Sequence, residues 1–164
     1  MHSRIDHPAQ TVPGAMQALH KLGGAIRQMG VPATTRSLME VRAGQINGCS
    51  GCVDIHSREL KAAGESDERI FTVAAWREST YFTEAERAAL ALTEAVTRLA
   101  DRHDPVPDEV WDEAARHYDD AELAALVLPI ATINAWNRLN VATRQMTGPW
   151  VERLISREPA GEAA

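Results

Sequence analysis

The sequence has few aromatic residues, only two cysteines and no long apolar run. Aromatics make up 5% of its 164 residues. Ala, Leu, Glu and Arg, which are strong helix formers, dominate the middle and end of the chain, and we therefore expect an all-α domain. No stretch approaches the roughly 18 apolar residues of a membrane-spanning helix, and the polar first ten residues have no signal-peptide core. We therefore expect a cytoplasmic protein.

The chain also lacks an excess of basic residues. Its formal net charge of −6 argues against binding to nucleic acid and to an anionic membrane surface. A chain of this length can bury enough surface to fold without disulfide staples. In the cytosol a disulfide is usually transient and catalytic. The two cysteines, Cys49 and Cys52, therefore raise a question of chemistry rather than of stability.

Caps, breakers and apolar periodicity predict six to seven helices in one domain over residues 13–148. Residues 1–12 are expected to be a flexible N-terminus and residues 149–164 a flexible tail. The helices are expected over 13–29, from a cap at Thr34 or Thr35 to 46, from Cys49 to about 63, and over 67–77, 84–100, a short segment after Pro107, and 120–145.

Two helices suggest contacts beyond a single copy of the chain. The helix over 84–100 has one apolar stripe, which includes Leu99, but Leu90 falls outside it. The helix over 120–145 is apolar nearly all round, so it is either central or partly covered by another subunit. We therefore expect a homo-oligomer. Asn134, Asn137 and Arg138 interrupt this last helix; they either line the active site or an interface, or mark the solvent side.

The strongest chemical signal is the cluster Cys49, Cys52 and His56. Residues three and four apart share a helix face, so two sulfurs at this spacing can close a disulfide beside an imidazole. The helix N-terminus favours a thiolate at Cys49, whereas His56 favours one at Cys52. Two other interpretations stay open. The pair could be half of a zinc site completed by His103 and His117, or two small buried hydrophobic residues.

The segment Gln45–His56, with the pattern Gln-Ile-Asn-Gly-Cys-x-x-Cys-x-x-x-His, resembles the AhpD-like alkylhydroperoxidase family within the carboxymuconolactone decarboxylase superfamily. The resemblance covers about residues 13–148 and implies an all-α fold, trimers or hexamers, and reduction of a hydroperoxide. It further implies that Cys52 attacks the peroxide, that Cys49 supplies a proton and then closes the disulfide, that His56 relays protons, and that a protein dithiol restores the pair. The sequence has no glycine-rich phosphate loop and no sign of a haem or flavin, so we expect no cofactor and no bound metal.

Two positions depart from the family pattern. Ser37 stands where the family usually has a relay glutamate, and a hydroxyl is no base near neutral pH. Glu40, one turn later, either replaces that glutamate or is a solvated surface residue. Gly51 stands where His or Tyr is common. We therefore keep three further hypotheses beside the thiol peroxidase: a lactone decarboxylase, a non-catalytic redox sensor, and a zinc protein.

Overall fold

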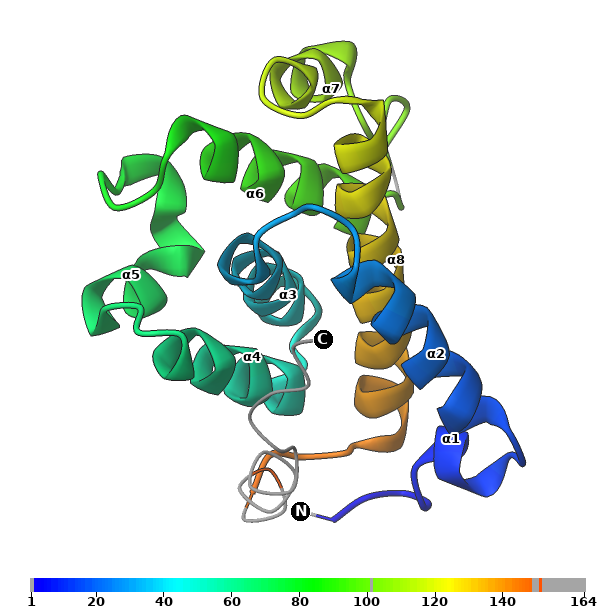
Figure 1. The fold of residues 1–164 in the computed structure, drawn as a ribbon. Helices are drawn as coiled ribbons and strands as arrows, with labels where there is room; N and C mark the ends of the chain where they lie inside the picture. The colour runs from blue at the N-terminus through cyan, green and yellow to red at the C-terminus, as the bar shows by residue number, and fades with distance from the viewer. Residues whose placement is uncertain (1, 101, 149–150, 152–164) are drawn as a thin grey trace.

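The computed structural model describes residues 2–100, 102–148 and 151, and this part of the chain is helical without strands (Figure 1). The expected all-α class is therefore confirmed. The elements are α1 (Pro8–Thr11), α2 (Ala15–Arg27), α3 (Ala33–Asn47), α4 (Ser50–Ala62), α5 (Asp67–Thr72), the 3₁₀ helix η1 (Val73–Glu78), α6 (Glu84–Thr97), α7 (Asp108–Ala115) and α8 (Asp120–Thr143).

Helix boundaries differ from the sequence expectations mainly near the N-terminus. Helix α1 lies within the segment expected to be flexible, and α2 begins only at Ala15 because Gly14 adopts a left-handed φ of 80°. Thr34 and Thr35 do not cap α3, which begins two to three residues earlier than expected, after Pro32. The expected helix over 67–77 is divided into α5 and η1. Nearly all of the expected tail over 149–164 lies outside the described residues.

Helix α3 is the centre of the domain. It packs against α4, α6 and α8, and Figure 1 shows these three helices around it. Most of its buried apolar side chains divide between two clusters, and Ala43 joins a third, which contains the cysteine pair. Met39 joins a cluster formed with α6, α7 and α8, whereas Leu38 and Val41 join one formed with α4, α5, η1 and α6. This two-sided burial explains why α3 has no single apolar stripe.

Leu90 corrects one of the two arguments for an oligomer. It is fully buried in the cluster with Leu38 and Trp76, so the monomer itself explains why it is apolar. Leu99, expected on the buried stripe, is 52% exposed because α6 ends at Thr97. On α8, Leu128 and Val141 remain partly exposed. The homo-oligomer thus stays a prediction, supported now by α8 alone.

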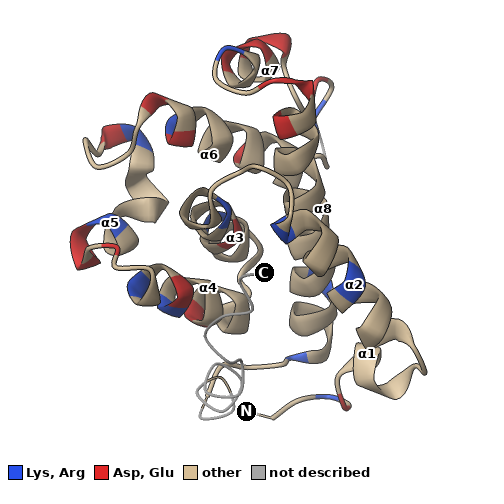
Figure 2. Ribbon diagram, in the orientation of Figure 1, with Lys and Arg blue, Asp and Glu red and all other residues tan. Residues whose placement is uncertain are grey.

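Charged side chains of both signs alternate over α4, α5 and α6, whereas α7 is mainly acidic (Figure 2). Two carboxylates of α6, Glu86 and Glu94, are exceptions because they are buried. Glu94 of α6 is buried and accepts hydrogen bonds from Trp76 Nε1 at 3.0 Å, Arg42 Nε at 2.7 Å and Arg77 Nη1 at 2.7 Å. This carboxylate therefore ties α6 to α3 and η1. None of the helices in the described part of the chain has the length and apolar character needed to cross a bilayer.

Replacing Glu94 by glutamine is expected to lower the free energy of unfolding at pH 7 by about 2 kcal/mol, because charge-assisted hydrogen bonds are lost in the interior. Burial opposes ionisation, but the hydrogen bonds from Trp76, Arg77 and Arg42 lower the pKa of Glu94 from 4.5 to about 2. A lowered pKa in the folded state contributes stability that is present above pH 4.5 and lost as the pH falls toward 2.

Urea unfolding at pH 7 and at pH 3 tests this expectation. The difference between the wild type and Glu94→Gln should be smaller at pH 3. Glu68→Gln on α5 is the matched control, because Glu68 is exposed. A difference of equal size at both pH values would show that the charge of Glu94 does not carry the effect.

Candidate redox site

The site begins at the turn between α3 and α4. Two residues, Gly48 and Cys49, separate α3 from α4. Gly48 caps α3 in a left-handed conformation (φ 70°), which costs glycine little. Cys49 is the N-cap of α4, and its Sγ accepts a hydrogen bond from the backbone N–H of Cys52 at 3.3 Å. A Cβ on Gly44 would lie 3.0 Å from Val53, so the lack of a side chain lets α4 approach α3 closely.

Cys49 and Cys52 form a disulfide, with their Cα atoms 5.4 Å apart. Both are buried, at 2% and 3% exposure, and they pack with Ala43, Ile133 and Trp136. The expected pairing of the two sulfurs is thus observed. The interpretation as two independent buried hydrophobic residues does not hold for this structure. A shallow cavity of about 410 Å³ lies beside the pair, and Cys49 lines it together with residues of α3 and α4.

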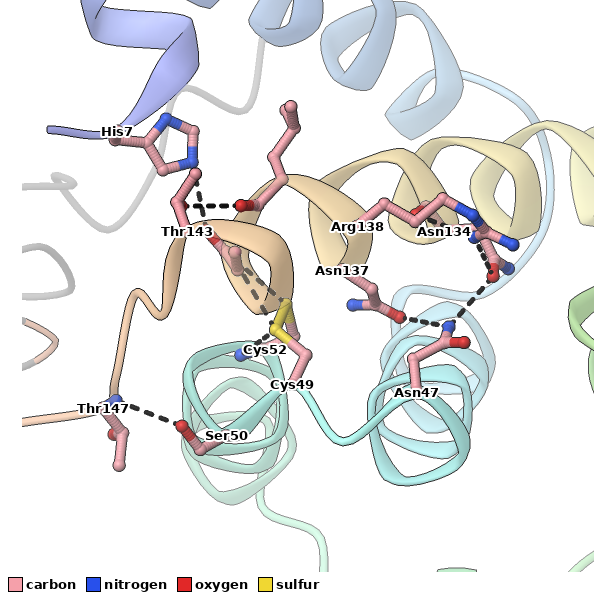
Figure 3. Close-up of a disulfide and its surroundings, with 12 residues drawn as sticks. His7, Asn47, Cys49, Ser50, Cys52, Asn134, Asn137, Arg138, Thr143 and Thr147 are labelled. Atoms are coloured by element: carbon pink, nitrogen blue, oxygen red, sulfur yellow. Dashed lines mark hydrogen bonds between the residues drawn. A yellow bond between two sulfur atoms is a disulfide. The ribbon is translucent and has the colours of Figure 1, made fainter. Parts of the chain in front are cut away.

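An amide from α8 contacts both sulfurs. Asn140 Nδ2 donates to Cys49 Sγ at 3.5 Å and to Cys52 Sγ at 3.4 Å (Figure 3). His7 fixes the orientation of this amide: its Nδ1 accepts from the backbone N–H of Ala9, so its Nε2 carries the hydrogen and donates to Asn140 Oδ1 at 3.0 Å. The N-terminal segment is therefore part of the site.

His56 lies one turn after Cys52 on α4, but its contacts in this structure are with carboxylates. Its Nδ1 donates to Glu59 Oε2 at 2.7 Å and lies 3.2 Å from Glu40 Oε2. Ser37 Oγ donates to the same Glu59 oxygen at 3.2 Å. Glu40 is thus not a solvated surface residue. Among the described residues, neither sulfur forms a hydrogen bond with His56.

The pKa values in this cluster follow from burial and from the two carboxylates. Burial raises the pKa of Glu40. Burial alone would lower the pKa of His56, but Glu40 and Glu59 outweigh it and raise that pKa. Burial would raise the pKa of Glu59, but the hydrogen bond from His56 and its positive charge lower it. The cluster therefore holds a proton on His56 beside an ionised Glu59, and Glu40 is the carboxylate that is easier to protonate.

Two sets of side chains in the chain have the types of atom that bind metals. The expected zinc partners His103 and His117 are exposed, and α7, which His117 follows, lies at the opposite end of the molecule from the start of α4 (Figure 1). Zinc binding by this set is therefore excluded in this fold. Glu40, His56 and Glu59 offer ligand atoms within 4.8 Å of one another. Their mutual hydrogen bond and ion pairs already account for these atoms.

Three residues of the site, Asn140, Glu59 and His7, were not predicted from the sequence. Asn140 lies three residues after Asn137, so the period of the helix could have placed both on one face. Glu59 lies three residues after His56, which is the spacing of a helical pair. His7 carried no sequence signal, because it reaches Asn140 across 133 positions of the chain. Three polar residues of α8 were expected either to line a site or interface or to face solvent. Asn134 and Asn137 are buried, whereas Arg138 is exposed.

The chain belongs to the carboxymuconolactone decarboxylase family, whose model matches residues 13–95. Its all-α fold and its cysteine pair are those of an AhpD-like member of this family. The structure of ATU0492 from Agrobacterium tumefaciens, a protein of unknown function provisionally assigned to AhpD antioxidant defence, superposes with a TM-score of 0.84 at 34% identity. The match covers 90% of this chain and 99% of that one.

Two relatives in bacteria have no assigned activity. YdfG of Bacillus subtilis is 35% identical over 142 residues, which are 87% of this chain and 95% of YdfG. YnjA of Escherichia coli is 34% identical over 107 residues, covering 65% of this chain and 57% of YnjA. The debrominase Bmp8 shares the fold, with a TM-score of 0.72 at 20% identity, over 88% of this chain and 76% of Bmp8.

Proposed function

We propose that this chain is a thiol peroxidase that reduces alkyl hydroperoxides through Cys49 and Cys52. The observation that carries the proposal is the disulfide between these residues at the N-terminus of α4, under an amide donor from α8. A helix N-terminus and a nearby N–H donor both favour a thiolate over a thiol, and the thiolate is the reactive form. Membership of the family and the likeness to ATU0492 support the same reaction.

The proposed cycle has two steps within this chain. The Cys52 thiolate attacks the outer oxygen of the hydroperoxide, so that an S–O bond forms, the O–O bond breaks, and the alkoxide leaves and takes a proton to become the alcohol. The sulfur is oxidised by two electrons and the peroxide is reduced by two. The Cys49 thiol then attacks the Cys52 sulfenic acid: the S–S bond forms, the S–O bond breaks, and the leaving hydroxide takes the thiol proton and departs as water.

A dithiol of a partner protein completes the cycle by thiol–disulfide exchange: its own sulfurs are oxidised to a disulfide and both cysteines of this chain are reduced. Cys49 lines the shallow cavity and is therefore the sulfur that we expect the partner to attack. We further propose that the enzyme acts in the cytoplasm as a homo-oligomer, a trimer or hexamer, through the partly exposed apolar side chains of α8.

The cluster of Glu40, His56 and Glu59 is the proposed source of the proton that the alkoxide takes up. A protonated imidazole beside two carboxylates can release and recover a proton near neutral pH. His56 Nδ1 is held by the carboxylates, so we propose that the proton leaves from Nε2, which has no hydrogen-bond partner in the described part of the chain. In this way Glu40 and Glu59 together replace the relay glutamate that is absent at Ser37.

Counting free thiols tests the proposal. The reduced protein is treated with one equivalent of cumene hydroperoxide, alkylated under native conditions, and measured by intact mass; cumyl alcohol serves as the control. We expect both thiols to be lost, with the mass decreasing by two hydrogens. If both thiols remain alkylatable, the peroxidase proposal fails and a lyase of the family's decarboxylase type becomes the leading alternative. Oxidation without turnover would favour a redox sensor.

A further inference from the structure

One buried amide beside the disulfide has an unsatisfied donor. Asn137 of α8 is fully buried, and its Nδ2 has no hydrogen-bond partner among the described residues. Leaving a buried N–H unpaired costs free energy, and native proteins rarely tolerate it without a reason. The oxygen of this amide has a partner in Asn47, but its nitrogen has none, so the position calls for a ligand that accepts a hydrogen bond from Nδ2.

The direction in which this amide points is fixed by a chain of hydrogen bonds that starts at Asn134. Asn134 Nδ2 donates to the carbonyl oxygen of Ile130 at 2.9 Å and to Thr97 Oγ1 at 3.0 Å. Arg138 Nη1, which can only donate, contacts Asn134 Oδ1 at 2.7 Å. The oxygen and nitrogen of Asn134 are therefore unambiguously placed, and its oxygen faces Asn47.

The hydrogen bonds of Asn47 fix the orientation of the Asn137 amide. Its Nδ2 has two hydrogens and donates one to Asn134 Oδ1 at 2.9 Å and the other to Asn137 Oδ1 at 2.8 Å. The oxygen of Asn137 must therefore face Asn47, which leaves its Nδ2 on the opposite side. Figure 3 shows this nitrogen on the side of the disulfide. Asn140, one turn further along α8, presents its own Nδ2 to the same two sulfurs.

We propose that Asn137 Nδ2 is a catalytic hydrogen-bond donor that binds the oxygen atom transferred from the hydroperoxide to the cysteine sulfur. The inference rests on the proposed peroxidase function and adds the residue that holds the oxygen. In the first step the amide positions this oxygen for attack as the O–O bond breaks and the S–O bond forms, while the negative charge develops on the leaving alkoxide oxygen. In the second step it stabilises the same oxygen as the S–O bond breaks and water leaves.

A preorganised donor of this kind acts at no cost of rearrangement, because the relay through Asn47 and Asn134 already holds it in place. In the disulfide state the oxygen has left as water, which accounts for a donor without a partner. The neighbouring Asn140 already has acceptors in both sulfurs, so it is suited to the thiolate rather than to the oxygen. The two amides of α8 thus take different parts in the reaction.

The test compares two reactions of the same thiolate in Asn137→Leu. Oxidation by cumene hydroperoxide transfers oxygen to sulfur, whereas alkylation by iodoacetamide does not. We expect the rate constant for hydroperoxide to fall about tenfold, the size expected when one hydrogen bond that orients the attacked oxygen is lost. We expect the rate constant for iodoacetamide to change by less than about twofold, because the thiolate and its access are unaltered. The urea midpoint should fall modestly, because leucine removes the oxygen that accepts from Asn47 Nδ2 together with the unpaired donor.

Thr132→Val is the matched control, because Thr132 is a buried polar residue of the same helix that bonds only to Leu128 O. Asn137→Ala serves as the second variant if the leucine variant does not fold. Equal decreases in both rate constants would overturn the inference, since Asn137 would then act only through packing or thiol acidity; no decrease in either would overturn it too. If the wild type itself does not react with hydroperoxide, the proposed function fails, which is a distinct result.

Discussion

Replacement of Cys52 by serine is expected to abolish hydroperoxide reduction, with a loss of at least about 1000-fold in rate, because the attacking sulfur is gone. Replacement of Cys49 by serine is expected to leave the first oxidation intact and to stop the cycle at a sulfenic acid on Cys52. The reason is that a hydroxyl cannot close a disulfide. Treatment with hydroperoxide followed by a sulfenic-acid trap and intact mass should show one adduct in Cys49→Ser and none in Cys52→Ser.

An adduct on Cys49 in the Cys52→Ser variant would reverse the order of the two sulfurs. Two features of the structure make this outcome informative. Cys49 rather than Cys52 accepts the backbone N–H at the start of α4, and Cys49 lines the shallow cavity. Both features are compatible with attack by Cys52 if Cys49 is the sulfur that the partner dithiol attacks. Ser50→Ala is a suitable control, because Ser50 lies between the two positions and its Oγ only accepts from Thr147 N–H.

The second large effect is expected at His56. His56→Gln should lower the rate of hydroperoxide reduction near pH 7 about 100-fold, because glutamine cannot hold or release a proton in this range. The rate should depend on pH with two limbs. It rises as the thiolate forms and falls as His56 loses its proton, so the alkaline limb reports the raised pKa of His56.

Glu40→Gln should move the alkaline limb to lower pH. The negative charge of Glu40 raises the pKa of His56, so its removal lets that pKa fall and the proton is lost earlier on the alkaline side. The acid limb, which reports the thiol, should not move. Glu113→Gln is the matched control, because Glu113 of α7 forms an exposed pair with His117, just after the end of that helix, away from the cysteines. If the alkaline limb does not move in Glu40→Gln, the cluster of Glu40, His56 and Glu59 does not supply the proton.

The outline of the fold and the two cysteines could be predicted from the sequence because both depend on local rules. The helices expected from residues 67, 84 and 120 begin there, because Ser66, the Thr83–Glu86 capping box and Asp119 cap their first turns. The α4 pair follows from helical spacing alone. Errors arose where tertiary contacts decide: Leu90 belongs to a second core cluster behind its own helix, which no periodicity within α6 could reveal.

The polar part of the site was less predictable for the same reason. The sequence could not decide whether Glu40 belongs to the site or to the solvated surface, because this depends on whether α4 brings His56 within reach. Ser37 was recognised as a departure, but its actual use, a hydrogen bond to Glu59, joins residues 22 positions apart. Asn140 and His7 come together from opposite ends of the chain. Such contacts follow from the packing of α8 and not from any local pattern.

The contact between His7, Asn140 and the cysteine pair also sets an order in which a newly made chain can complete its reactive centre. The sulfurs leave the ribosome early, whereas the amide that holds them follows 91 residues after Cys49. During synthesis the thiols therefore emerge without Asn140, and His7, which precedes both, remains without its acceptor until α8 exists. The chain thus acquires the donor that favours its thiolates only when α8 folds, so full reactivity comes well after the two cysteines have been made.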